Sequence, residues 1–171
     1  MTHVAAKNTQ PNSASVNGSR RRLYILVGIP GSGKTTYARA ELATGVRVSL
    51  DDLRMMLTGI SFDQRYEALV GKIGDAALDI AMASSRRRGH DVVFDATSVT
   101  RRWRSATVRR VIANDLEPHC VFFDIPLSVA LERNRARPVP VPDEVVVRFF
   151  RQLQPPTVDE GFIEVTVIPQ Q

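Results

Sequence analysis

The sequence predicts an α/β protein in which a parallel sheet of about five strands carries helices on both faces, together with a helical lid. Two observations lead to this fold. Short apolar runs alternate with segments of helical periodicity along most of the chain, as expected when each helix crosses over to a parallel strand. A Gly-rich segment over 28–33 separates the first apolar run from the first helical segment.

The apolar runs are short enough to be buried strands. In chain order, the predicted strands cover 23–27, 46–50, 92–94, 119–123 and 162–168. Cys120, the only cysteine of the chain, lies within the fourth of these runs. We interpret it as a small core residue, and a single cysteine excludes an internal disulfide.

The helical segments are bounded by glycine and proline. The predicted helices cover 34–43, 65–88, 103–113, 127–135 and 143–153. Gly45 and Gly89 follow the first two and predict their ends. In the second segment, four apolar residues recur at helical spacing and indicate the helix; they are Leu69, Ile73, Ala77 and Ile80. Prolines after the fourth helix prevent it from continuing.

Composition predicts one domain over 20–171 and a disordered tail over 1–19, which is polar and rich in Asn, Ser and Thr. No apolar run approaches the roughly 20 residues of a membrane span. We also find no secretory signal, so we expect a cytoplasmic protein, in the host cytoplasm if a phage encodes it. The net charge of +5 comes mainly from arginine. A genome bias toward arginine explains this charge as well as a phosphate-rich binding partner does, because arginine pairs with phosphate oxygens.

The segment Gly28-Ile29-Pro30-Gly31-Ser32-Gly33-Lys34-Thr35 fits the P-loop pattern G-x-x-x-x-G-K-[ST], between a predicted strand and a predicted helix. Such a loop wraps backbone amides around the phosphates of ATP at the helix N-terminus. The predicted nucleotide-binding residues are Gly28, Gly31, Ser32, Gly33, Lys34, Thr35 and Thr36. Lys34 is expected to reach the β- and γ-phosphates, and the Thr35 hydroxyl to bind Mg²⁺.

The second predicted strand runs into Asp51-Asp52-Leu53-Arg54. Carboxyl ends of parallel strands face the ligand crevice, so we predict that Asp51 takes the proton of an attacking hydroxyl. Arg54 follows three residues later, which places it beside Asp51 in a helix and makes it a candidate clamp for the acceptor or its phosphate. The alternative is that both aspartates only cap a helix.

The third predicted strand ends at Asp95, as in Walker B elements, where the carboxylate holds Mg²⁺ through water. Helix capping is again the alternative. Behind it come Thr97, Arg101, Arg102 and Arg104. These residues either line an acceptor site or belong to a solvated helix face.

Arg133 and Arg137 are four residues apart and are predicted to share a helix face, where they would stabilise the transferring phosphoryl group. The prolines that follow suggest a closing lid. The alternative is a basic last turn that complements the helix dipole. Arg135 points elsewhere on the helix and is left out of the lid.

These motifs together resemble the kinase domain of bacteriophage-type polynucleotide 5′-hydroxyl kinases and, more broadly, the small AAA-domain predicted kinases. The resemblance rests on G-I-P-G-S-G-K-T-T, D-D-L-R, V-V-F-D-A-T, R-N-R-A-R and V-P-D-E-V, in this order. It implies that Asp51 is the general base, that Arg54 contacts the acceptor-side phosphate, and that Arg133 and Arg137 contact the nucleotide phosphates.

The sequence thus predicts a kinase that uses ATP and Mg²⁺ to phosphorylate the 5′-hydroxyl end of DNA or RNA, as in nucleic acid repair. The alternatives are a kinase of a small-molecule hydroxyl (nucleoside, sugar or antibiotic), a toxin-like P-loop kinase, and an ATP-binding switch. An arginine-rimmed opening that admits a strand would favour the first function, and a closed apolar pocket would favour a small-molecule acceptor.

Overall fold

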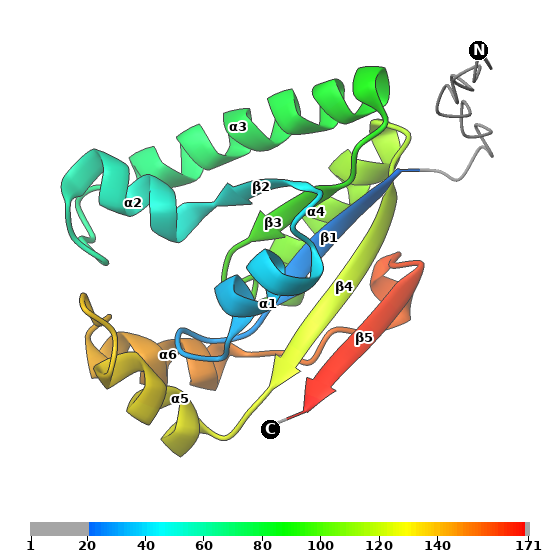
Figure 1. Cartoon of the computed structure of the whole chain (residues 1–171). Helices are drawn as coiled ribbons and strands as arrows, with labels where there is room; N and C mark the ends of the chain where they lie inside the picture. Colours follow the sequence, from blue (N-terminus) through cyan, green and yellow to red (C-terminus); the bar gives the residue numbers. More distant parts are fainter. Residues whose placement is uncertain (1–20, 170–171) are drawn as a thin grey trace, which may run out of the picture.

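The computed structural model describes residues 21–169, whose strands form one parallel sheet (Figure 1). The strands are β1 (Arg22–Val27), β2 (Val46–Ser49), β3 (Val92–Asp95), β4 (Glu117–Asp124) and β5 (Glu164–Pro169). They lie side by side in the order β2-β3-β1-β4-β5. The predicted five-stranded parallel sheet is confirmed, whereas the tail predicted over 1–19 falls outside the described residues.

The crossover segments are helical. The helices are α1 (Lys34–Glu41), α2 (Leu50–Thr58), α3 (Glu67–Arg88), α4 (Arg101–Ala113), α5 (Leu127–Arg135) and α6 (Asp143–Gln152). No range had been predicted for α2, and Leu50, assigned to the second strand, is its first residue. The prediction that Gly45 ends the first helix is also wrong, because α1 stops at Glu41.

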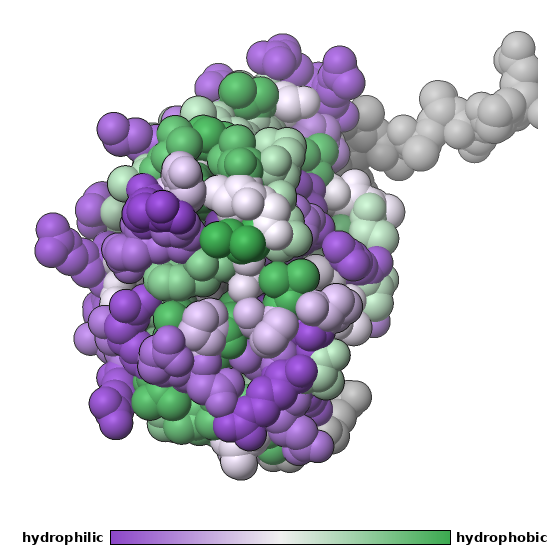
Figure 2. Space-filling model, turned by 90° about the vertical axis from the view of Figure 1, so that its left-hand side faces the viewer, coloured by the Kyte–Doolittle hydropathy of each residue, from purple (hydrophilic) through white to green (hydrophobic). Residues whose placement is uncertain are grey.

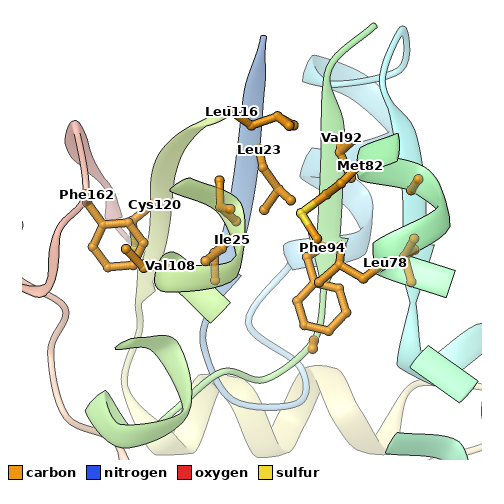
Figure 3. Packing of buried hydrophobic residues seen from close by; sticks show 14 of the residues in the cluster. Leu23, Ile25, Leu78, Met82, Val92, Phe94, Val108, Leu116, Cys120 and Phe162 are labelled. Atoms are coloured by element: carbon orange, nitrogen blue, oxygen red, sulfur yellow. The ribbon is translucent and has the colours of Figure 1, made fainter. Parts of the chain in front are cut away.

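Helices cover both faces of the sheet (Figure 1). On one face, Leu78 of α3 and Val108 of α4 belong to the same buried cluster as the strand residues Leu23 and Phe94 (Figure 3). On the other face, Ala38 of α1 packs in a second cluster with residues of β1, β3 and β4. Helices α5 and α6 form a third cluster with the loop that follows β1. These three contacts fix the helices around the carboxyl end of β1.

The residues that indicated α3 by their spacing cover only part of its buried face, where Ala77 packs against the core. Leu69 and Ile80 are 47% and 69% exposed, whereas Val70 and Leu78 of the neighbouring stripe are buried. A β-carbon added at Gly74 would lie 2.3 Å from Leu50 Cδ2, so a small residue lets α2 and α3 approach closely. The side of α3 that faces the core therefore carries Gly74 between Val70 and Leu78, although Leu69 and Ile80 have large apolar side chains.

Cys120 is a core residue, as predicted. It is 1% exposed and packs in the cluster that β1, β3, β4, α3 and α4 share (Figure 3). Burial raises the pKa of its thiol to about 12, although the charge of Arg104 opposes this shift. Because the thiolate is the nucleophilic form, Cys120 is inert in the folded protein.

Candidate active site

The loop between β1 and α1 has the backbone of a phosphate cradle. Gly31 and Gly33 have φ angles of 83° and 98°, in the left-handed region where residues with a β-carbon are strained. A β-carbon on Gly31 would lie 2.2 Å from the carbonyl oxygen of Ala130 in α5. The Gly28 N–H donates to the Thr97 carbonyl oxygen at 3.0 Å. The cradle is thus fixed to α5 on one side and to the loop after β3 on the other.

Lys34 begins α1 and turns back over the cradle. Its ammonium donates to the carbonyl oxygens of Gly28 and Ile29, at 2.8 and 2.9 Å. Burial lowers its pKa, while the charges of Asp95 and Asp51 oppose that shift. The positive end of the side chain therefore lies at the loop that would hold phosphate, with two carboxylates nearby.

Thr35 and Asp95, the two predicted metal ligands, are in contact. The Thr35 hydroxyl donates to Asp95 Oδ2 at 2.9 Å, and the Asp95 side chain is 4% exposed. Among residues 21–169, no group of three His, Cys, Asp or Glu side chains could hold a metal ion. A hydroxyl and one carboxylate still fit Mg²⁺, because this ion usually takes one or two carboxylates and completes its octahedron with phosphate oxygens and water.

Arg47 is a residue of this site that the sequence analysis missed. Its guanidinium donates to Asp95 Oδ2 at 2.7 Å and also forms an ion pair with Asp52. The signal that could have identified it is the alternation of β2, which puts Arg47 and Ser49 on the same face of the strand as it enters Asp51-Asp52.

Asp51 and Arg54 lie side by side, as the helical spacing predicted. Arg54 Nη1 donates to Asp51 Oδ1 at 2.6 Å. Glu67, at the start of α3, was not predicted, yet it binds Arg54 through Nε and Nη2 at 2.7 and 2.9 Å. Burial alone lowers the pKa of Arg54, but hydrogen bonds and charges of Glu67 and Asp51 raise it above its ordinary value. Arg54 is thus held between two carboxylates.

The helix-capping alternative for the aspartates is wrong. The cap of α2 is Ser49, whose hydroxyl accepts a hydrogen bond from the Asp52 N–H at 3.2 Å. The cap of α4 is Thr100, five residues beyond Asp95. The Asp51 and Asp95 side chains are therefore not used as N-caps.

Arg133 and Arg137 come together in a way that the sequence did not predict. Helix α5 ends at Arg135, so Arg137 lies beyond it and the two do not share a helix face. Both nevertheless line one cavity, and Arg137 Nη2 lies 3.5 Å from Asp51 Oδ2. Arg135, left out of the predicted lid, pairs with Asp143 instead.

This cavity, of about 610 Å³, contains most of the predicted site. It is lined by Pro30, Gly31, Gly33, Lys34, Thr35, Thr36, Arg39, Asp51, Asp52, Arg133, Arg137 and Pro138. A second cavity of about 560 Å³ shares Gly33, Thr36 and Arg133 with it and extends along α1 to apolar residues of β4 and β5. Arg54, Asp95, Gly28 and Ser32 lie outside the lining of the first cavity, and Ser32 lines the second.

The arginines after β3 divide between two positions: Arg101 and Arg102 are exposed, as on the solvated helix face that was one predicted alternative, whereas Arg104 is buried. The Arg104 side chain is fully buried, where it binds Glu160 and the carbonyl oxygens of Ser98 and Val99. It therefore lines no acceptor site and belongs to no solvated face. Arg101 is half exposed and pairs with Asp159 on the surface.

Within residues 21–169, no helix has the length and apolar character needed to cross a membrane.

Comparisons with known proteins identify the family and the fold. A family model described as an AAA domain, AAA_33, matches residues 23–156. The chain is 25% identical over 164 residues to "Transcription factor bHLH140" of Arabidopsis thaliana, a match that covers 90% of this chain but 16% of that protein. The chain thus spans about a sixth of the length of this curated relative.

Solved structures resemble the chain as well. A chain in "Structure of the Pnkp1/Rnl/Hen1 RNA repair complex" is 27% identical, with a TM-score of 0.61, and the match covers 82% of this chain and 47% of that one. A putative kinase from Chloroflexus aurantiacus has a TM-score of 0.68 at 17% identity, over 90% of this chain and 87% of that one. This second likeness concerns the fold alone. The chain belongs to the AAA domain family AAA_33 and has the fold of a P-loop kinase.

Proposed function

We propose that the protein is an ATP- and Mg²⁺-dependent kinase that transfers the γ-phosphate to the 5′-hydroxyl end of DNA or RNA. One observation supports this most strongly. The carboxylate of Asp51 and the paired arginines Arg133 and Arg137 line the same cavity as the phosphate cradle and Lys34. A switch that only binds nucleotide needs no carboxylate at the acceptor position.

In this proposal, the loop that contains Gly28, Gly31, Ser32 and Gly33 surrounds the β-phosphate, with Thr36 beside it, while the Gly28 N–H keeps its bond to the Thr97 carbonyl oxygen. Lys34 leaves its carbonyl partners for the β- and γ-phosphates, where its charge stabilises the transition state. Thr35 and Asp95 hold Mg²⁺, which neutralises charge on the phosphate oxygens when it is bound. Lys34, Thr35 and Thr36 already line the cavity at the cradle.

Asp51 serves as the general base. Arg54 binds one of its carboxylate oxygens, whereas the other lies 3.5 Å from Arg137, the more exposed of the two arginines. The acceptor hydroxyl gives its proton to Asp51 as its oxygen bonds to the γ-phosphorus. The bond to the bridging oxygen breaks, and ADP leaves with the negative charge that Arg133 and Arg137 stabilise.

The charge of the cavity favours a nucleic acid end as acceptor. Lys34, Arg39, Arg133 and Arg137 oppose only two carboxylates, Asp51 and Asp52, in its lining. A closed apolar pocket, as a small neutral acceptor would favour, is not what surrounds Asp51. Figure 2 shows the left-hand side of the molecule as drawn in Figure 1, where hydrophilic and hydrophobic patches are interspersed. The 27% identity to a chain of an RNA repair complex supports the same class of acceptor.

A panel of acceptors tests the proposal. The full chain is given ATP labelled in the γ-phosphate, Mg²⁺, and either 5′-hydroxyl oligonucleotides of DNA or RNA, mononucleotides, nucleosides or sugars. We expect label on the oligonucleotides, and none on the same oligonucleotides that already carry a 5′-phosphate. Transfer only to small molecules would refute the proposed acceptor, and absence of transfer to any hydroxyl would refute the kinase.

A further inference from the structure

Arg47 has an unusual position for an arginine of an edge strand. Its side chain is 19% exposed and lies between two carboxylates, those of Asp95 and Asp52. The three residues come from β2, α2 and β3, and the β2–β3 register pairs Ser49 with Asp95. The roles proposed above for the cradle, the general base and the lid do not involve the Arg47 guanidinium.

Arg47 contacts the carboxylate oxygen of Asp95 that would attract a cation. Asp95 Oδ2 accepts hydrogen bonds from both the Thr35 hydroxyl and Arg47 Nη1, at 2.9 and 2.7 Å. Thr35 and Asp95 are the two residues proposed to hold Mg²⁺. A fixed positive charge thus touches the very oxygen through which this carboxylate would attract a divalent ion.

We propose that Arg47 is a positioning residue that makes the uptake of the divalent cation depend on the nucleotide. Arg47 balances the charges of Asp52 and Asp95, so that the chain alone attracts a divalent ion weakly. The phosphates of ATP supply the negative charge that then brings the ion in. This inference rests on the proposed function only for the position of the cation beside Thr35 and Asp95.

The physical reason is the size of the Coulomb term. A divalent ion about 5 Å from a unit positive charge is repelled by an energy worth about tenfold or more in affinity, even with water-like screening. Without Arg47, the carboxylates of Asp52 and Asp95 and the Thr35 hydroxyl would form a cluster of hard oxygen donors, which suits a divalent cation without nucleotide.

A different role for Arg47 predicts a different result. If Arg47 only ties the edge strand to α2, its substitution lowers stability and leaves the affinity for divalent ions unchanged. Binding therefore separates the two roles, whereas turnover would not, because both predict some loss of activity.

Mn²⁺ serves as the probe, measured by electron paramagnetic resonance on the full chain without nucleotide. We expect Arg47→Gln to bind Mn²⁺ about tenfold more tightly than the wild type, and Arg47→Lys, which keeps the charge, to change by about threefold or less. The double variant Arg47→Gln/Asp52→Asn removes one charge of each sign, and we expect its affinity to return close to that of the wild type.

Folding is followed by the fluorescence of Trp103, the only tryptophan, which stacks on Phe94 next to Asp95 with ring centroids 5.3 Å apart. A variant of low stability still gives an answer, because an ion that binds only the folded state raises the melting temperature. An Mn²⁺ affinity of Arg47→Gln within twofold of the wild type, or no rise of its melting temperature with Mn²⁺, would overturn the inference. Failure of the wild type to bind Mn²⁺ together with ATP would instead refute the proposed function.

Discussion

Two clusters of arginine–carboxylate ion pairs in this molecule differ in their burial and in their position relative to the cavity. In the first, Arg104 of α4 and Glu160 have fully buried side chains. In the second, Arg54 is 14% exposed and binds Glu67 and Asp51, whose side chains are 24% and 44% exposed. The first cluster joins α4 to the short 3-10 helix at Val158–Glu160, and Asp51 of the second lines the cavity with the phosphate cradle.

The difference lies in how many hydrogen bonds each cluster completes internally. Arg104 donates to both Glu160 oxygens and to two backbone carbonyl oxygens, and Glu160 also accepts from the Thr157 N–H. Nothing remains for a ligand. Asp51 Oδ2, in contrast, lies at the cavity, 3.5 Å from Arg137 Nη2. Burial with complete pairing makes one cluster structural, and partial pairing at a cavity leaves the other available for chemistry.

The largest effect should follow from Asp51→Ala. If this carboxylate accepts the proton of the acceptor, the turnover number falls by about 10²–10⁴-fold, the usual contribution of a general base. The affinity for ATP, measured by calorimetry, should stay within about threefold, since the cradle is untouched. Asp159→Ala, at an exposed surface pair, is the matched control and should keep its turnover. Loss of ATP binding in Asp51→Ala would contradict the assignment of this residue as base.

Breaking the buried cluster should instead reduce stability. Arg104→Met leaves the Glu160 charge buried without its partner, and we expect a loss of about 3–5 kcal/mol in the free energy of unfolding. Chemical denaturation followed by Trp103 fluorescence measures this. The double variant Arg104→Met/Glu160→Leu should recover much of the loss, because no unpaired charge is left. If the single variant unfolds like the wild type, the cluster is not the structural element that its burial implies.

Lys34→Ala should affect activity without a loss of stability. Its ammonium is proposed to stabilise charge in the transition state, so turnover should fall by about 10²–10³-fold. The melting temperature should not decrease, since burial lowers the pKa of Lys34 and thus disfavours its charged form. Assays of phosphate transfer and thermal melts on one preparation measure both. Wild-type turnover in this variant would argue against the cradle as the site of transfer.

A smaller effect is expected at Glu67, which contacts Arg54 and does not line the cavity. Glu67→Gln removes a charge from the pair and should loosen Arg54, reducing turnover by about tenfold, as for one weakened hydrogen bond to a charged group. Asp75→Asn, on the same helix and paired with Arg110 at the surface, is the matched control. Equal turnover in the two variants would mean that Arg54 does not need Glu67 for its position.

The smallest effect is expected three residues before Arg104. Arg101 pairs with Asp159 at the surface, with side chains 50% and 64% exposed, and exposed pairs of this kind contribute little. Arg101→Ala should leave the midpoint of thermal unfolding within experimental error of the wild type. A clear decrease in this midpoint would show that the exposed Arg101–Asp159 pair also stabilises the fold, as the buried Arg104–Glu160 pair is expected to do.

The sequence could predict features that depend on residues close together in the chain. The phosphate cradle is one contiguous segment whose glycines, lysine and threonine act through local backbone geometry, so its pattern was sufficient. The strands were found because each is a short run of mainly apolar residues between turn or helix signals. The neighbourhood of Asp51 and Arg54 followed from the helical spacing of three residues, and their contact is present in α2.

Contacts between segments that are distant in the sequence could not be predicted and depend on the tertiary structure. Arg104 was predicted at an acceptor site or on a solvated helix face. In the fold it is buried and forms an ion pair with Glu160, which lies 56 residues later in the chain. Arg47 contacts Asp95 because the sheet order places β2 beside β3. The buried stripe of α3 was chosen by the close approach of α2 at Gly74. Local patterns carry no information about which segment packs against which, because that depends on the sum of many weak contacts over the whole domain.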